Sequence, residues 1–462
     1  MVRLGVDVGD TNTDAALVDG DRVVATAKTP TTADVTGGIR DAMARLGTDA
    51  GVEPGPVTAV MIGTTHFVDA LLAADRLAPT AVIRFGLPAT RALPPLVDWP
   101  DRLHAAIGGH AHLCHGGHEY DGTRYEDFDE TEFRDALGRT LDAGARSFAI
   151  SSVFSPVDAE FELRAAEIIA EQVPNLPVSL SHEIGRMGLL GRENATVVNA
   201  ALRGLAEQVT AGLATAVAEA GMTAPVFLSQ NDGTLMDVDH ARRYPVATFA
   251  SGPTNSMRGA AFLAGHLDCA VIDVGGTSTD VGVLQQGFPR EAPTDVSVAG
   301  IATNFRMPDI LSIDIGGADA GRTGTALART AERMAAAVER MRVSADPLPV
   351  VAVGGAGVLV PDGLAGASTV IRPEHHQVAN AVGAAVAQVG GEVDRVFSAP
   401  SGRRGSVLDR ARQEAVDRTV AAGARPGSVR IVKIEEVPLA YLPGNATRVR
   451  VKAIGDLALG PS

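Results

Sequence analysis

The chain has 462 residues, a formal net charge of −15 and a pI near 5.2, which argues against nucleic acid or anionic membranes as main partners. Two cysteines exclude a disulfide framework, and no segment approaches the roughly 18 uninterrupted apolar residues of a membrane span. With a strand pattern at the start and no signal-sequence pattern, we expect a cytoplasmic protein of two or three domains.

The N-terminal segment predicts a strand, a tight turn and a second strand. Apolar residues frame Asp7 at the end of the first strand, and apolar residues 15–18 form the second strand. The turn between them holds Gly9, Thr11, Asn12 and Thr13. A carboxylate at a strand tip suits Mg²⁺, and the N–H and hydroxyl groups of such a turn suit phosphate oxygens. A single hairpin of this kind is also a common structural turn.

Strands and helices alternate through the first 180 residues. Strands are expected over 21–29, 57–62, 147–153 and 178–181, and helices over 36–46, 67–74, 129–143 and 158–172. This alternation predicts a largely parallel sheet covered by helices. The proline-broken stretch 86–122 is expected to be irregular, and it holds Cys114 with His104, His110, His112, His115 and His118. A metal site and a glycine-flanked surface loop both remain open interpretations.

The middle of the chain begins with a polar pair and a long helix. His182 and Glu183 follow a buried strand and are candidates for catalysis or for substrate or metal contact, although a surface turn explains them equally well. A helix is expected over 191–220 and a strand over 226–230. The polar run 251–255 begins another helix, where it would bind a ligand or cap the helix.

Residues 271–283 repeat the N-terminal hairpin. Asp273 corresponds to Asp7, and the turn after it holds Gly275, Gly276, Thr277, Ser278 and Thr279. Two copies separated by about half the chain predict two similar lobes, each offering one phosphate-binding hairpin to a shared cleft. Asp7 and Asp273 would then face each other across Mg²⁺ and the phosphates.

The rest of the chain adds a glycine turn and a charged C-terminal segment. A strand over 350–353 runs into Gly354 and Gly355. Helices are expected over 323–342, 380–390 and 406–422, and strands over 429–435 and 448–454. We therefore divide the chain into an N-terminal lobe (1–180), a second lobe (181–397) and a C-terminal appendage (398–462).

Together these motifs resemble a known family. The paired hairpins resemble the phosphate-1 and phosphate-2 loops of the actin-like ATPase fold, and Gly354-Gly355 resembles its adenosine motif. The whole chain resembles the ATPase-type, hydantoinase A-like subunit of the hydantoinase/oxoprolinase family. That narrower resemblance is carried by residues 62–65, 181–185, 251–256, 273–280 and 437–444.

The resemblance implies an α/β, two-lobed actin-like (duplicated ribonuclease H-like) fold with a small C-terminal α+β appendage. It implies ATP and Mg²⁺ as cofactors, with Asp7 and Asp273 as catalytic and metal-binding residues. It also implies phosphorylation of a cyclic amide or imide, such as a hydantoin or 5-oxoproline, followed by ring opening. A second hydantoinase-type subunit or a homo-oligomer is the expected partner.

Two alternatives stay open on the same fold, a small-molecule kinase and a non-catalytic ATPase switch. The segment 312–320 also departs from the family, since many relatives carry three glycines and a serine there and this chain does not. That departure leaves the substrate class and catalytic competence open.

Overall fold

The computed structural model describes residues 1–9, 11–32, 35–50, 57–276, 278–293, 295–314, 324–397, 404–439 and 446–459. Its largest sheet has nine strands in the order β20-β21-β19-β10-β9-β4-β1-β2-β3. In chain order these are β1 (Val2–Val8), β2 (Asn12–Asp19), β3 (Arg22–Pro30), β4 (Val57–Thr64), β9 (Val226–Ser229), β10 (Thr234–Asp237), β19 (Gln388–Phe397), β20 (Arg430–Pro438) and β21 (Thr447–Gly455).

A second sheet repeats the start of the first. Its order is β13-β12-β11-β17-β18, and β16 also pairs with β12. These strands are β11 (Cys269–Val274), β12 (Thr279–Gln285), β13 (Phe288–Pro289), β16 (Ile310–Ile313), β17 (Leu348–Val353) and β18 (Ala367–Ile371). In both sheets an antiparallel three-strand meander is followed by a strand parallel to the first, so the order is third, second, first, fourth, fifth. This duplication confirms the two-lobed actin-like fold.

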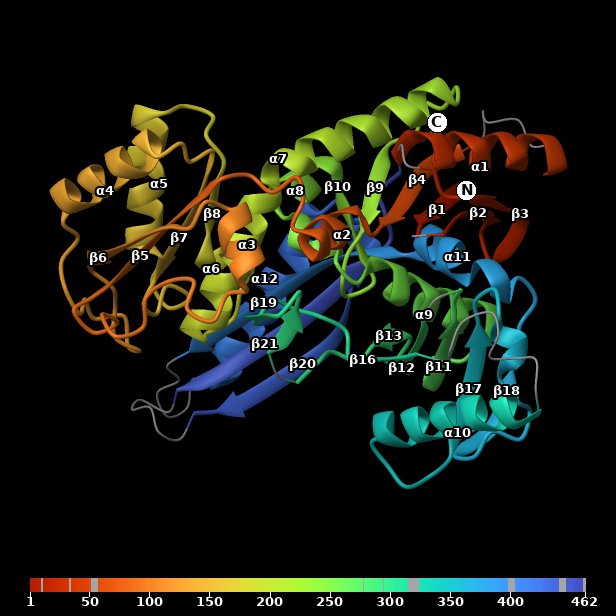
Figure 1. Ribbon diagram of the computed structural model, residues 1–462. Coiled ribbons are helices and arrows are strands. Elements are labelled where there is room, and N and C mark those ends of the chain that lie inside the picture. Colours follow the sequence, from red (N-terminus) through yellow and green to blue (C-terminus); the bar gives the residue numbers. More distant parts are fainter. Residues whose placement is uncertain are drawn as a thin grey trace.

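A separate four-stranded sheet lies at one end of the molecule, opposite α10 (Gly324–Met341) of the second lobe (Figure 1). Its order is β6-β5-β7-β8, with all neighbours parallel. The strands are β5 (Thr80–Leu87), β6 (His110–His115), β7 (Ser147–Ser152) and β8 (Val178–Leu180), and the helices beside them are α3 (Asp101–Ala106), α4 (Glu130–Asp142) and α5 (Glu160–Gln172). The expectation of irregular structure over 86–122 was wrong for α3 and β6, while residues 88–100 and 116–122 lie outside the helices and strands as expected.

Helices connect the sheets. The longest, α7 (Leu189–Glu219), packs its buried face against the core of the nine-stranded sheet. The remaining helices are α1 (Val35–Ala50), α2 (His66–Ala73), α6 (Ser181–Ile184), α8 (Val238–Arg243), α9 (Ser251–Ala264), α11 (Ala379–Val386) and α12 (Arg404–Ala421). The helix expected over 380–390 ends at 386, because residues 388–397 continue as strand β19. In the described part of the chain, no helix is both long and apolar enough to cross a bilayer.

The C-terminal segment does not form a sheet of its own. Strand β21 pairs with β19 over nine residues, and β20 pairs with β21, so both extend the nine-stranded sheet. A two-stranded hairpin, β14 (Val296–Val298) and β15 (Ile301–Thr303), packs near α7. The division at residues 180 and 397 remains a proposal, and the nine-stranded sheet crosses both boundaries.

Candidate functional site

The two acidic hairpins have the same register. Asp7 lies opposite Asp14 in the β1–β2 ladder, and Asp273 lies opposite Asp280 in the β11–β12 ladder. Each turn is closed by a matching backbone bond, from Gly9 N to the Asn12 carbonyl (3.1 Å) and from Gly275 N to the Ser278 carbonyl (3.0 Å). The repeat in the sequence is therefore also a repeat in backbone geometry.

The tips of the two hairpins lie next to each other. A Cβ atom built on Gly276 would stand 3.8 Å from Oγ1 of Thr11. Gly275, Gly276, Ser278 and Thr11 are exposed and Gly9 and Asn12 are half-buried, so these tip groups are open to a ligand. Thr277 lies outside the described residues. Two hairpins that lie far apart in the sequence thus present exposed donors to one place.

The second threonine of each hairpin turn, Thr13 in the first and Thr279 in the second, is buried. Thr13 points inward, where its hydroxyl contacts the Thr31 hydroxyl at 3.2 Å. Oγ1 of Thr279 is buried and has no hydrogen-bond partner among the described residues. An unpaired buried hydroxyl is costly, and a phosphate oxygen is one group that would satisfy it.

Asp7 is held by amides from two helices. Nδ2 of Asn255, on α9, donates to its Oδ1 at 3.1 Å, and Nδ2 of Asn380, on α11, donates to its Oδ2 at 3.0 Å. Nδ2 of Asn380 also donates to Asp14 at 2.9 Å, and Lys28 pairs with the same carboxylate at 2.8 Å. Asn255 was a candidate from the sequence, but Asn380 was missed because only the crossing of the helices brings it to Asp7.

Burial raises the pKa of Asp7 to about 6, and the nearby Asp14 carboxylate raises it further while the Asn255 amide opposes the shift. Burial likewise raises the pKa of Asp273 to about 6, against a hydrogen bond from Ser256, and the charges of Asp280 and Asp7 add to the rise. The charge of Asp7 thus acts on Asp273, which indicates that the two carboxylates lie within electrostatic reach of each other. A divalent cation between them would favour the ionised forms.

Glycines make room for both carboxylates. A Cβ atom on Gly63 would lie 2.0 Å from Oδ1 of Asp7, and one on Gly354 would lie 2.3 Å from Oδ1 of Asp273. Gly354 also has φ +85°, in the region that favours glycine. Gly354 therefore contacts the second hairpin directly, while the neighbouring Gly355 is exposed with open space at its Cβ position.

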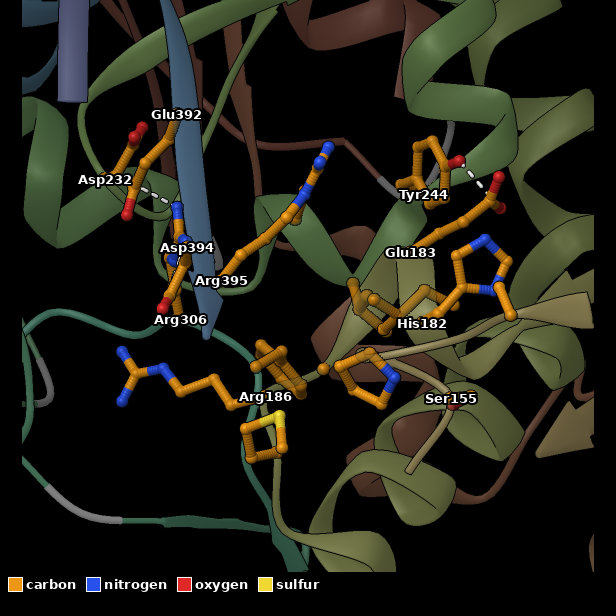
Figure 2. A pocket seen from close by; sticks show the side chains of 18 of the residues that line it. Ser155, His182, Glu183, Arg186, Asp232, Tyr244, Arg306, Glu392, Asp394 and Arg395 are labelled. Carbon is orange, nitrogen blue, oxygen red and sulfur yellow. Dashed lines mark hydrogen bonds and ion pairs between the residues drawn. The ribbon is translucent and has the colours of Figure 1, made fainter. Parts of the chain in front are cut away.

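His182 and Glu183 belong to a different place, a pocket of about 580 Å³. Figure 2 shows His182, Glu183 and Tyr244 along one side and Asp232, Glu392, Asp394 and Arg395 along the other. Asp7 and Asp273 do not line this pocket. The four residues expected to act together are thus divided between two sites.

The first turn of α9 adjoins both sites. Oγ of Ser251 bonds the backbone of Thr64, at the strand end beside Asp7. Oγ1 of Thr254 donates to the carbonyl of Ala250 at 2.6 Å and also lies 3.3 Å from the carbonyl of Gln230, which lines the pocket. The polar run 251–255 therefore connects the hairpins to the pocket, a role that neither open interpretation from the sequence had included.

His182 is fixed by a buried carboxylate. Nδ1 of His182 and Oε2 of Glu162 are 2.7 Å apart, and the backbone N–H of His182 donates to the same oxygen at 3.0 Å. Oε1 of Glu162 accepts from the backbone of Ser152 (3.0 Å) and the hydroxyl of Ser181 (2.5 Å). Although burial acts to raise it, these bonds hold the pKa of Glu162 below its usual range. An ionised Glu162 places the imidazole proton on Nδ1 and leaves Nε2 able to accept one.

Glu162 carried no signal in the sequence, because it reads as one more acidic residue in the first turn of a helix. Glu183 has surface partners instead, Arg243 at 2.6 Å and the hydroxyl of Tyr244 at 2.9 Å. His182 is therefore the better candidate for proton transfer, and Glu183 has the contacts of an orienting residue.

The histidine-rich stretch does not form one cluster. His110, His112 and His115 lie on strand β6, and Nδ1 of His115 is 3.1 Å from Glu132. Burial raises the pKa of Cys114 to about 12, so this cysteine is a thiol rather than a thiolate ligand. The surface-loop interpretation was wrong for β6, while His118 lies apart and is buried.

Two family profiles match the chain. Residues 3–173 match the hydantoinase/oxoprolinase N-terminal region, and residues 192–329 match the hydantoinase/oxoprolinase domain. The chain belongs to the hydantoinase/oxoprolinase family, as its motifs indicated.

Individual relatives come from two enzyme systems. The chain is 27% identical over 310 residues to the caprolactamase subunit alpha of Pseudomonas jessenii, covering 62% of this chain and 44% of that protein. It is 26% identical over 219 residues to the acetophenone carboxylase gamma subunit of Aromatoleum aromaticum, covering 45% of this chain and 30% of that protein. The matched part is thus less than half the length of either curated relative.

Two solved structures share the fold. The ATP-dependent caprolactamase from Pseudomonas jessenii superposes with a TM-score of 0.79 at 16% identity, over 98% of this chain and 87% of that chain. Nucleotide-free acetone carboxylase superposes with a TM-score of 0.68 at 16% identity, over 99% of this chain and 88% of that chain. At this identity the likeness establishes the fold alone.

Proposed function

We propose that this chain is the ATP-binding subunit of an ATP-dependent hydrolase that opens a cyclic amide or imide, such as a lactam or a hydantoin. The observation that carries the proposal is the pair of matched acidic hairpins whose tips lie together, with the pocket of His182 and Glu162 adjoining them through α9. The family and the name of the caprolactamase relative support a cyclic amide as substrate.

The residues around the hairpins fit Mg²⁺ and a nucleotide. Asp7 and Asp273 are carboxylate oxygen donors of the kind that Mg²⁺ prefers, and the charge of Asp7 is one of the causes that raise the pKa of Asp273. Gly9, Thr11, Asn12, Gly275, Gly276 and Ser278 offer phosphate contacts at the tips, and behind them lie the buried side chains of Thr13 and Thr279, the second with a hydroxyl that has no partner among the described residues. Bound Mg²⁺ would neutralise developing charge on the transferred phosphoryl group.

An amide needs activation because its nitrogen is a poor leaving group. In the proposed reaction, the amide oxygen takes the γ-phosphoryl group of ATP, and ADP leaves. Water adds to the activated carbon, the C–N bond breaks as the nitrogen takes a proton, and a second water cleaves the remaining acyl phosphate to the acid and phosphate. Nε2 of His182 accepts the proton of the attacking water, because Glu162 holds the proton of the ring on Nδ1.

A second subunit is part of the proposal. The two named relatives are subunits, and the matched part of this chain covers 44% and 30% of their lengths. We therefore expect full ring-opening activity with a second hydantoinase-type subunit, or within a homo-oligomer.

The test is ATP hydrolysis against a panel of lactams, hydantoins and hydroxylated metabolites, with and without a co-expressed second subunit. ADP and phosphate release that depends on a lactam or hydantoin, with a ring-opened product, supports the proposal. Formation of a stable phosphorylated alcohol would instead indicate a small-molecule kinase. Hydrolysis stimulated only by the added protein would indicate an ATPase switch.

A further inference from the structure

We propose that His118, Asp158 and Glu160 form a second metal site, for a divalent transition-metal ion such as Zn²⁺. His118 lies in the turn that follows β6, and the two carboxylates lie at the start of α5. None of the three residues takes part in the proposed ATP or amide chemistry, so this inference stands independently of the proposed function.

The first support is a buried imidazole without hydrogen-bond partners. His118 is 1% exposed, and neither of its ring nitrogens has a partner within the described residues. Nε2 lies 3.9 Å from Oδ2 of Asp158 and 3.9 Å from Oε2 of Glu160, which is too long for hydrogen bonds. A buried polar nitrogen aimed at two carboxylates and bonded to neither leaves space for a bridging group.

The second support is that the ring is fixed in this position. The His118 ring stacks on Phe161 with centroids 4.7 Å apart, and the backbone N–H of His118 donates to the carbonyl of Val153 at 3.1 Å. Oδ1 of Asp158 accepts from the backbone N–H of Glu160 at 2.9 Å, which orients the first carboxylate. The donor atoms are therefore held in place by the fold.

The spacing and chemistry suit a small divalent ion. The three donor atoms lie within 4.8 Å of one another. Zinc bonds to nitrogen and oxygen are each about 2.0–2.2 Å, so two of them at a tetrahedral angle span roughly 3.4 Å, and the exposed carboxylates would move toward Nε2 by about 0.5 Å to bind the ion. An imidazole nitrogen favours Zn²⁺ over Mg²⁺, and the two carboxylates are partly exposed, at 44% and 46%, so an ion can enter.

Arg124 competes for one of the ligands. Its Nη2 donates to Oε1 of Glu160 at 2.5 Å and its Nε donates to Oε2 at 3.2 Å. A bound ion would have to share Oε2 with the guanidinium. Removing the guanidinium should therefore strengthen metal binding, an effect that a purely packing role for His118 does not predict.

The test is calorimetric titration of the full chain with Zn²⁺ in excess Mg²⁺, together with Co²⁺ absorption as a reporter of ligand geometry. We expect one zinc equivalent to be lost in His118→Phe, which keeps an aromatic ring against Phe161. We expect Asp158→Asn to weaken the same binding at least tenfold and Arg124→Gln to tighten it severalfold.

His110→Phe, on the adjacent strand, is the matched control and should bind zinc as the wild type does. Unchanged zinc stoichiometry and affinity in both His118→Phe and Asp158→Asn would overturn the proposal. Equal losses in the His110 control and in His118→Phe would also overturn it, because they would indicate nonspecific binding to the histidine-rich strand.

Discussion

At the residue scale, the chemistry depends on carboxylates that the fold keeps out of water. Asp7 is 4% exposed and receives an amide from each of two helices. Glu162 is fully buried and accepts four hydrogen bonds. Burial acts to raise the pKa of both carboxylates; at Asp7 the charge of Asp14 adds to the rise, whereas at Glu162 the hydrogen bond and charge of His182 and the charge of Arg192 outweigh it.

Asp7→Asn should abolish Mg²⁺-dependent nucleotide binding while leaving the fold intact. Asparagine fills the same space, but it cannot supply a negative oxygen to the ion. We expect at least a 10²-fold loss of ATP turnover, in line with the loss of a charged group that acts on phosphoryl transfer. Asp273→Asn should behave alike.

The matched control for this pair is Asp19→Asn, at the far end of β2, whose side chain is 53% exposed. Nucleotide affinity measured by titration, with circular dichroism as the folding check, compares the three variants. Wild-type affinity in Asp7→Asn would remove the assignment of the site.

The free energy of unfolding of the free chain should fall as pH rises, whereas the extra stabilisation by bound Mg²⁺ and nucleotide should grow. The pKa of Asp7 is raised from 3.8 to about 6 in the folded chain, so the folded state keeps a proton that the unfolded state loses. The free energy of unfolding therefore falls as pH rises from about 4 to about 6, by about 3 kcal/mol for this group. Nucleotide with Mg²⁺ binds the ionised form, so its stabilisation should grow across the same window.

Urea unfolding at several pH values, with and without Mg²⁺ and ATP, measures how the free energy of unfolding changes with pH in each condition. The Asp7→Asn/Asp273→Asn double variant is the control, since it should lose the pH dependence that these groups contribute. An unchanged slope in the double variant would contradict the argument.

Glu162→Gln should impair His182 without displacing it. Glutamine still accepts a hydrogen bond from Nδ1 but no longer favours the imidazolium by its charge. We expect turnover to fall by about 10²-fold, measured as ADP release in the presence of substrate. Glu167→Gln, exposed on the same helix, should leave turnover unchanged. Wild-type turnover in Glu162→Gln would show that the charge of this carboxylate has no role in the reaction.

At the element scale, the crossing of α9 and α11 builds the support for Asp7. A Cβ atom on Gly383 would lie 1.8 Å from the carbonyl oxygen of Asn255, and one on Gly259 would lie 1.8 Å from that of Ala379. The helices therefore pack backbone to backbone, which only glycine permits at these points. This close approach brings Asn255 and Asn380 to the same carboxylate.

Gly383→Ala should separate the two helices. Overpacking of this kind costs about 1–3 kcal/mol, and the rigid carbonyl opposite makes the upper end more realistic. Nucleotide affinity should fall as well, because Asn255 moves. Gly204→Ala is the matched control, since its Cβ position in α7 is open. Chemical denaturation should show the control unchanged or more stable by about 0.5–1 kcal/mol. Equal stability of the two variants would contradict the packing argument.

At the scale of the whole molecule, a buried ion network joins the second lobe to the C-terminal strands. Arg450, on β21, pairs with Glu392 on β19 and with Glu291, which follows β13. All three side chains are 10% exposed or less. Although burial acts to lower it, the two carboxylates raise the pKa of Arg450. The C-terminal segment is thus tied to both sheets.

Arg450→Leu should leave two buried carboxylates without their main partner and lower the free energy of unfolding by about 3–5 kcal/mol. The Arg450→Leu/Glu291→Leu double variant should recover part of that loss, because Arg306 still pairs with Glu392. Arg425→Leu is the control. It removes the surface ion pair between Arg425 and Asp456, whose side chains are 60% and 52% exposed, and should change the free energy of unfolding by less than about 1 kcal/mol. Additive losses in the double variant would argue against a coupled network.

The sequence by itself determined the duplicated hairpins, their carboxylates and glycines, the two-lobed fold and the family. These are local patterns, in which an aspartate at a strand tip and glycine in a tight turn have direct conformational reasons. Only the tertiary structure decided which distant groups meet: Asn380 at Asp7, Glu162 at His182, and the extension of the first sheet by the C-terminal strands. Such contacts depend on helix crossings and sheet order, which bring together residues 20 positions apart at His182 and 373 positions apart at Asp7 and leave no periodic trace in the chain.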